Sequence, residues 1–142
     1  LVVRGNCSLV TGIAGISENI HINGIIDRYL EHSRIFIFAN GGEEKYYIGS
    51  ADWMPRNLDN RIEVLAPVYD KEIQADLKRI VCYGYRDTAK GRIVDGTGEN
   101  RPWENRPSTL CKDFTPALAE AETATVVFRS QEELYRKYKN TL

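Results

Sequence analysis

The spacing of apolar residues predicts alternating strands and helices along most of the chain. Leu1–Val10 is rich in residues that favour strands, and Arg34–Ala39 is a continuous β-branched and aromatic run typical of a buried strand. Two further segments, Asn23–Leu30 and Asp70–Tyr83, follow helical spacing. Each of these two segments begins with a side chain that can serve as the N-cap of a helix.

Small and polar residues separate these elements. Thr11–Ile16 is predicted to turn the chain, and Asn40-Gly41-Gly42 is a strong hairpin signal that leads into a partner strand over Lys45–Gly49. Ala51–Asn60 is predicted to be a polar loop, and Arg61–Val68 a strand broken by its proline.

The pattern is weaker in the last third of the chain. It predicts a short strand at Lys90–Asp95, a loop over Gly96–Pro107, and then a helix, a strand and a helix at Thr115–Glu122, Thr125–Phe128 and Gln131–Lys139. This alternation of strands and helices predicts an α/β fold, an α+β mixed sheet flanked by helices.

The composition is that of an ordinary globular domain. The chain has 142 residues, 42% hydrophobic and 27% charged, with a net charge of −1. We therefore expect one domain with a real core and no nucleic-acid partner, since no charge excess points to one. No apolar run is long enough to span a bilayer. Because the chain begins without Met inside the apolar Leu1-Val2-Val3, we expect a fragment that holds only part of an active site.

The numbers and spacing of the cysteines and histidines limit the redox and metal chemistry that we expect. Cys7, Cys82 and Cys111 are odd in number and widely spaced, which argues against a disulfide framework and is typical of a reducing cytoplasm. Together with His21 and His32 they show no metal-ligand spacing. His21 has no evident partner, so we expect a structural or surface histidine.

His32 and Arg34 are the main candidates for chemistry. They stand two residues apart at the start of a predicted strand, so both side chains emerge on one face. The imidazole can transfer a proton or stabilise charge, and the guanidinium can bind two phosphate oxygens at once. The alternative is a histidine that complements the dipole at a helix C-terminus, followed by a surface arginine.

A second polar group follows the predicted strand at Lys45–Gly49, near His32 because the hairpin returns the chain. The Gly49-Ser50 turn lets the backbone approach an anion and offers the Ser50 hydroxyl, and Arg56 lies in the next loop. Asp52 would repel phosphate, so we expect it to orient His32 or a neighbouring arginine. The alternative is a strand end followed by a solvated, salt-bridged loop.

Arg4 interrupts the apolar segment at the N-terminus. It lies in the middle of a predicted strand, so it is either at a sheet edge or directed into a polar cleft. We favour the cleft, because Gly5 beside it permits close approach of a ligand.

Four segments of the sequence carry a family resemblance. Val3–Leu9, Gly15–Ile20, Asp27–Ile35 and Gly49–Asp59 closely resemble the last domain of bacterial polyphosphate kinase of the long, multi-domain type. The resemblance covers about Leu1 to Trp103, and the tail from residue 104 to 142 resembles nothing known. It implies a phospholipase-D-like domain. It also implies an enzyme that reversibly moves the terminal phosphate of ATP, with Mg²⁺, onto inorganic polyphosphate.

The resemblance also implies roles for particular residues. His32 matches the second essential histidine, which contacts the nucleotide phosphates, and Arg4 matches a residue that binds them; the phosphorylated histidine lies in the preceding domain. Phospholipase D sites pair His-x-Lys with Gly-Ser-x-Asn, and Arg34 and Asp52 depart from that pattern. The departure disfavours phosphodiester hydrolysis.

The resemblance implies further expectations and leaves two alternatives open. The partners would be ATP, ADP, polyphosphate, the rest of the kinase chain and further copies in a homo-oligomer. The location would be cytoplasmic, with peripheral membrane association left open. The alternatives are a phospholipase-D-like phosphodiesterase half-site and a non-catalytic domain that binds polyphosphate or supports assembly.

Overall fold

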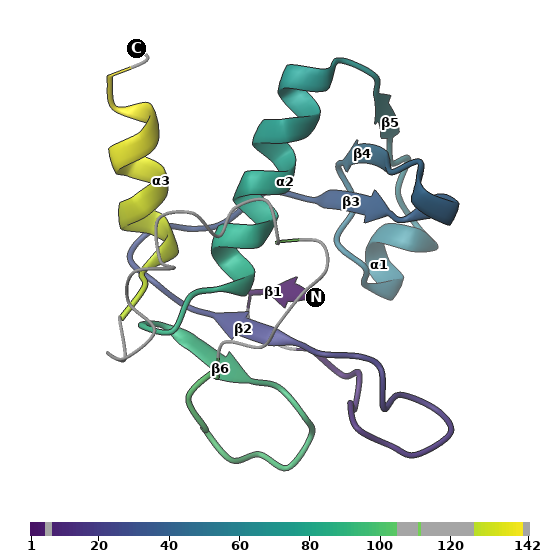
Figure 1. Ribbon diagram of the computed structural model, residues 1–142. Coiled ribbons are helices and arrows are strands. Elements are labelled where there is room, and N and C mark those ends of the chain that lie inside the picture. Colours follow the sequence, from purple (N-terminus) through teal and green to yellow (C-terminus); the bar gives the residue numbers. More distant parts are fainter. Residues whose placement is uncertain (5–6, 105–110, 112–126, 141–142) are drawn as a thin grey trace. The chain divides into compact units, whose positions relative to one another are not determined.

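A computed structural model describes residues 1–4, 7–104, 111 and 127–140 (Figure 1). The chain forms two compact units. The first unit combines Leu1–Leu30 with Arg79–Leu142, and the second unit is Glu31–Lys78. The predicted α/β fold class is confirmed, because β-strands and helices alternate along the chain.

The first unit is built on a three-stranded mixed sheet. Its strands are β1 (Val2–Val3), β2 (Asn23–Ile25) and β6 (Gly91–Ile93), with β2 in the centre, parallel to β1 and antiparallel to β6 (Figure 1). The strand expected at 90–95 is therefore confirmed. The strand expected over residues 1–10 is wrong in its length, because among the described residues only the first two valines after the N-terminus pair with β2.

The helix predicted from Asn23 to Leu30 is wrong. Asn23 is fully buried in β2, and its amide donates to the carbonyls of Gly84 and Asp87 at 3.0 and 3.3 Å. Three apolar residues of the expected helical face, Ile26, Tyr29 and Leu30, are instead about 60% exposed or more. The position is a strand because it lies between two other strands and caps a helix end, which overrides the local pattern.

The long helix α2 (Lys71–Tyr85) confirms the prediction for this region. Asp70 is its N-cap as expected, since the carboxylate accepts hydrogen bonds from the backbone of Glu72 and Ile73 at 2.9 and 3.0 Å. In the first unit, the end of α2 packs closely on β1. A Cβ added at Gly84 would lie 3.0 Å from a methyl group of Val2.

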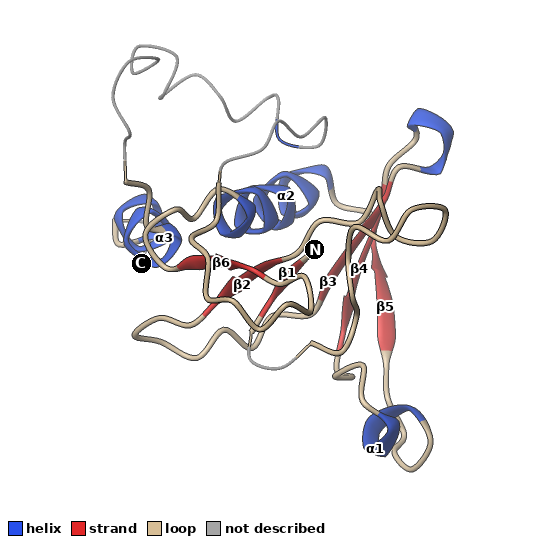
Figure 2. Cartoon of the chain, turned by 90° about the horizontal axis from the view of Figure 1, so that it is seen from below, coloured by secondary structure: helices blue, strands red, loops and turns tan. Residues whose placement is uncertain are grey.

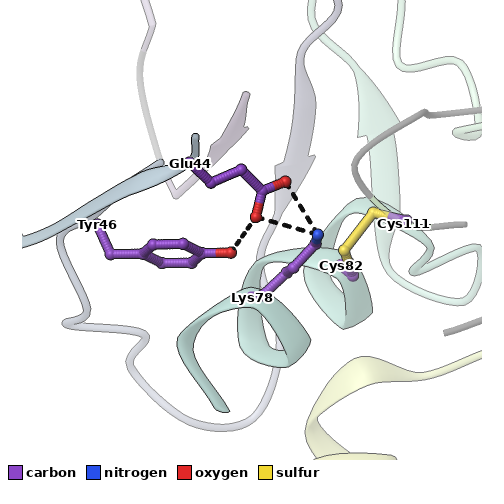
Figure 3. The surroundings of a disulfide bond; sticks show 5 residues. All are labelled: Glu44, Tyr46, Lys78, Cys82 and Cys111. Carbon is purple, nitrogen blue, oxygen red and sulfur yellow. Dashed lines mark hydrogen bonds and ion pairs between the residues drawn. A yellow bond between two sulfur atoms is a disulfide. The ribbon is translucent and has the colours of Figure 1, made fainter. Parts of the chain in front are cut away.

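A disulfide joins Cys82 of α2 to Cys111, which corrects the argument from the cysteine count and spacing against disulfides (Figure 3). The two residues are 29 positions apart, and both are buried. Cys7 is a free thiol. The sequence argument failed because an odd count excludes full pairing but does not exclude one bridge.

The C-terminal helix α3 (Ser130–Tyr138) confirms the last helix that the sequence predicts. The helix expected at Thr115–Glu122 lies outside the described residues. Of the strand expected at Thr125–Phe128, the first two residues also lie outside them, and the last two belong to no strand. Phe128 is nevertheless fixed, because its carbonyl accepts hydrogen bonds from the backbone of Thr88 and Ala89 at 3.0 and 3.1 Å.

The second unit is a three-stranded antiparallel meander. Its strands are β3 (Ile35–Phe38), β4 (Lys45–Gly49) and β5 (Leu65–Val68), which lie side by side in Figure 2. The turn between β3 and β4 is the short helix η1 (Asn40–Gly42), so the predicted hairpin is confirmed. The helix α1 (Pro55–Leu58) lies within the predicted polar loop.

Two strand predictions in the second unit need correction. β3 is half-buried rather than buried, since Phe38 is 52% exposed. β5 covers only the second half of the predicted 61–68 strand, and Pro67 lies inside it opposite Tyr47. A proline is tolerated there because β5 is the edge strand of the sheet.

A partly buried polar group ties β4 to the first half of α2 in the second unit. The hydroxyl of Tyr46 donates to Glu44, and the ammonium of Lys78 donates to both oxygens of that carboxylate at 3.0 and 3.1 Å (Figure 3). The Tyr46 hydrogen bond and then the Lys78 ammonium lower the pKa of Glu44. These contacts therefore keep the Glu44 carboxylate ionised.

Candidate phosphate-binding site

The hairpin of β3 and β4 brings together the two polar segments that the sequence singled out. The backbone amide of Gly49, at the end of β4, donates to the carbonyl of Arg34 at 2.9 Å. Residues 50–52 therefore begin beside Arg34, as the sequence predicts. His32, Arg34, Ser50 and Arg56 all belong to the second unit.

Arg34 is held by Asp52. Its Nε and Nη2 atoms donate to the same carboxylate oxygen, Oδ1, at 3.0 and 2.8 Å. The Arg34 side chain is 17% exposed and Asp52 is 40% exposed. The prediction that Asp52 orients a neighbouring arginine is confirmed.

The remaining edge of the Arg34 guanidinium lies against His32. Nη1 is 3.4 Å from Nδ1 of the imidazole and 3.2 Å from the His32 carbonyl oxygen, and Nη2 is 3.3 Å from Nε2. A neutral imidazole accepts at only one nitrogen. Two such short contacts therefore place the planar cation along the ring, and Arg34 fixes where the exposed imidazole points.

Ser50 is engaged within the protein. Its hydroxyl donates to Glu63 and accepts from the backbone amide of Val64 at 2.9 Å. The buried amide of Asn57 donates to the other oxygen of Glu63 at 2.9 Å. These two hydrogen bonds, from Ser50 and then Asn57, lower the pKa of Glu63, with smaller effects of Arg61 and Arg34.

Arg56 lies at the outer side of this group. Its Nη2 atom is 3.9 Å from Oδ2 of Asp52, and its side chain is 65% exposed. Asp52 thus stands between two guanidinium groups. Beside it, Trp53 stacks on Phe36 with ring centroids 5.6 Å apart and stays 76% exposed.

Arg4 belongs to the first unit. It follows β1 directly and is exposed, so it stands at a strand end rather than in the middle of a strand. Gly5 lies outside the described residues. His21 is also exposed, and its carbonyl accepts a hydrogen bond from the N-terminal ammonium at 2.6 Å.

Sequence reasoning missed Asn57 and Glu63 as partners of the Ser50 turn. Asn57 is only 2% exposed although the residues around it form a polar loop. No local pattern marks it, because its burial follows from the one-turn helix α1, which begins at Pro55. Pro55 itself is the one signal from which the helix could have been predicted.

The described residues contain neither a metal-binding cluster nor a membrane-spanning helix. Within them, no group of three or more His, Cys, Asp or Glu side chains is arranged to hold a metal ion. Within the same residues, no helix has both the length and the apolar character needed to cross a membrane.

Comparison with known proteins places this chain in a family. The chain matches the family model described as polyphosphate kinase C-terminal domain 2 over residues 1–112. It is 48% identical to a polyphosphate kinase of Escherichia coli (strain K12) over 128 residues, 86% of this chain and 19% of that protein. It is 43% identical to one of Thermosynechococcus vestitus over 126 residues, 88% of this chain and 16% of that protein.

The fold of this chain is also similar to part of the crystal structure of polyphosphate kinase from Porphyromonas gingivalis. The match covers 96% of this chain and 18% of that protein, with a TM-score of 0.73 and 35% sequence identity. The fold is therefore a phospholipase-D-like α/β domain. The chain belongs to the polyphosphate kinase C-terminal domain 2 family, and it spans less than a fifth of the length of these curated relatives.

Proposed function

We propose that this domain is part of an ATP:polyphosphate phosphotransferase. Such an enzyme reversibly transfers the terminal phosphate of ATP to a growing inorganic polyphosphate chain. The relatives are named polyphosphate kinase, and the family match covers most of the chain. The observation that carries the proposal is the contact between Arg34, fixed by Asp52, and the exposed imidazole of His32.

His32 and Arg34 act on phosphate oxygens in this proposal. Phosphoryl transfer spreads negative charge over oxygen atoms, so catalysis consists of positioning and electrostatic stabilisation. A protonated His32 stabilises the bridging oxygen that leaves with ADP, as proton donor or as charge. Arg34 holds the imidazole in place and adds a fixed positive charge, and Arg4 binds the nucleotide phosphates.

Ser50 and Arg56 have smaller roles. The Ser50 hydroxyl already donates to Glu63, so it binds phosphate only by exchanging that partner. Arg56 is 3.9 Å from Asp52 and mostly exposed, so it can turn toward an anion at little cost.

The cofactor and partners follow from the same reaction. Magnesium enters with ATP or ADP, and polyphosphate is the second substrate. The phosphorylated histidine comes from another part of the kinase chain, so the isolated domain is inactive. The enzyme is a homo-oligomer located in the cytoplasm or peripherally at a membrane, and it has no nucleic-acid partner.

The experiment is ATP-dependent polyphosphate synthesis by the full-length enzyme, wild type against His32→Ala, with protein phosphohistidine followed in parallel. Loss of synthesis by a folded variant supports the proposal. The phosphohistidine signal then separates a role in forming the intermediate from a role in extending the chain.

Three results would contradict it. Unchanged synthesis after His32→Ala removes His32 from the reaction and favours a binding or assembly domain. Diester cleavage without ATP, with phosphate covalently bound to His32, favours the phosphodiesterase alternative. Polyphosphate synthesis by the isolated 142-residue chain shows that no other domain is needed.

A further inference from the structure

The run of residues 128–131 is attached to the first unit by every one of its members. Phe128, Arg129, Ser130 and Gln131 each make polar contacts with residues far away in the sequence. We call this run the C-terminal anchor. It lies beyond residue 112, where the match to the family model ends.

Arg129 of the anchor forms a two-pronged ion pair with Asp27. Nε donates to Oδ2 at 2.8 Å and Nη2 donates to Oδ1 at 2.7 Å, and the Asp27 side chain is only 2% exposed. The parallel pair of hydrogen bonds fixes the orientation as well as the distance. The same carboxylate also accepts a hydrogen bond from the backbone of Arg28 at 2.7 Å.

Gln131 of the anchor binds the backbone of Tyr29. The Tyr29 amide donates to Oε1 at 3.0 Å, and Nε2 donates to the Tyr29 carbonyl at 2.8 Å. Gln131 is 7% exposed. The side-chain amide thus satisfies both polar groups of one peptide residue, as a neighbouring strand would.

The other two members hold the anchor itself in place. The backbone amide and hydroxyl of Ser130 donate to one oxygen of the fully buried Asp87 at 2.8 and 2.6 Å. The Phe128 amide donates to the Thr88 hydroxyl at 2.9 Å, and its ring meets Tyr83 edge to face. Arg129 and Gln131 are therefore presented from a rigid base.

The segment that the C-terminal anchor binds, at Asp27 and Tyr29, leads directly to His32. Residues 26–33 form no helix or strand between β2 and β3, and the first backbone hydrogen bond to the second sheet is that of the Arg34 carbonyl with the Gly49 amide. Asp27 and Tyr29 lie in its first half, and Tyr29 precedes His32 by three residues. A segment of this kind depends on side-chain contacts for its conformation.

We propose that Arg129 and Gln131 are positioning residues for His32, acting through the backbone of residues 27–29. The proposal rests on the proposed function of His32. It assigns a role in phosphoryl transfer to residues outside the family model. A displacement of about 1 Å at a reacting group is enough to cost about 10²-fold in rate. The anchor prevents such a displacement without touching the substrate.

The test uses the full-length enzyme with four variants: Gln131→Ala, Arg129→Gln, Arg129→Lys and the control Arg136→Gln. Arg136 lies in α3, which begins directly after Arg129, and it pairs with Glu133 at 2.5 Å on the exposed side. Its variant therefore makes the same change of charge away from residues 26–34. Two quantities are measured: hydrogen exchange of residues 26–34, and kcat and KM for ATP in polyphosphate synthesis.

We expect Gln131→Ala to speed exchange of the Tyr29 amide about tenfold, since one hydrogen bond is lost. We expect kcat to fall about tenfold or more while KM for ATP changes less than about twofold. Arg129→Gln should behave alike, Arg129→Lys should recover part of the loss, and Arg136→Gln should change neither quantity.

Three outcomes overturn the proposal, and they are distinguishable from one another. Unchanged exchange in residues 26–34 shows that the anchor does not define their path. Faster exchange with unchanged kcat shows that the anchor is structural only. A wild-type enzyme that makes no polyphosphate refutes the proposed function and with it the positioning role, while the exchange result still reports whether the anchor grips the segment.

Discussion

The molecule contains two arginine–aspartate pairs whose geometry differs in an informative way. In the first unit, Arg129 uses two nitrogens on two oxygens of Asp27, a carboxylate that is 2% exposed. In the second unit, both nitrogens of Arg34 that reach Asp52 donate to one oxygen, and the carboxylate is 40% exposed. We call the first pair closed, and we call the second open because Nη1 of Arg34 and Oδ2 of Asp52 lie outside it.

Under the proposed function, the open pair is the one that takes part in the chemistry. Arg34 keeps an edge against the His32 ring, and the second oxygen of Asp52 faces Arg56 at 3.9 Å. A cation held in place but not fully neutralised is what an incoming phosphate requires. The closed pair satisfies both partners, so it contributes order rather than a binding surface.

The largest expected effect is that of Arg34→Ala on the open pair. We expect kcat/KM for polyphosphate synthesis to fall about 10²- to 10³-fold, as for loss of one preorganised donor to a transition state. Thermal stability should change little, because Asp52 is partly exposed and Arg56 is close to it. Arg34→Lys should recover only part of the activity, since an ammonium cannot bind Asp52 and flank the imidazole at once. Equal activity of the wild-type enzyme and Arg34→Ala would remove the open pair from the reaction.

The second effect concerns the stability of the first unit, through the disulfide between Cys82 and Cys111. A bridge between residues 29 positions apart should contribute about 3 kcal/mol by restricting the unfolded chain. Cys111→Ala, or reduction of the wild type, should therefore lower the free energy of unfolding of the 142-residue chain by this amount. Denaturant unfolding with and without dithiothreitol measures it. A reductant effect of equal size on Cys111→Ala would show that the bridge is not its cause.

The third effect concerns the closed pair and the dependence of its stability on pH. Hydrogen bonds from Arg129 lower the pKa of Asp27 in the folded chain. A lowered carboxyl pKa gives stability that is present above the unfolded value, about 3.9 for Asp, and is lost as the pH falls through the folded value. Tm should therefore fall more steeply below about pH 4 in the wild type than in Arg129→Gln. Parallel Tm curves of these two proteins between pH 7 and pH 3 would contradict this account.

The open pair could be predicted from the sequence because its members are close together along the chain. His32 and Arg34 are two residues apart, and a hairpin turn of Asn and Gly residues fixes the register that returns Ser50 and Asp52 beside them. The N-cap Asp70 and the helix after it are local in the same sense. Turn chemistry and capping act over a few residues, so their outcome can be predicted without the rest of the fold.

The closed pair could not be predicted from the sequence, because its members are 102 positions apart. The same holds for β2, whose identity as a central strand depends on β1, on β6 and on the end of α2. Asn23 has the sequence signature of a helix N-cap, yet its amide caps the C-terminal end of α2 instead. Long-range pairing decided both cases, and a single sequence carries no local signal of it.

The smallest expected effect is that of Ser50→Ala, and it tests where the open site ends. The Ser50 hydroxyl is the largest contribution that lowers the pKa of Glu63, so its removal should move that pKa up toward the ordinary value of about 4.3. The stability that Glu63 gives above its unfolded pKa should shrink accordingly, and the acid side of the Tm curve should become flatter. Glu63 keeps the hydrogen bond from Asn57, and the Val64 amide turns to water.

Activity should therefore change less than about threefold, because an exposed hydroxyl that bonds only to Glu63 and the Val64 amide is replaced by solvent. NMR titration of Glu63 and kcat/KM of the full-length enzyme measure the two effects. A loss of tenfold or more in kcat/KM, with the Glu63 pKa unmoved, would mean that Ser50 exchanges its partner for phosphate. The open site would then extend from the Arg34–Asp52 pair to the turn at the end of β4.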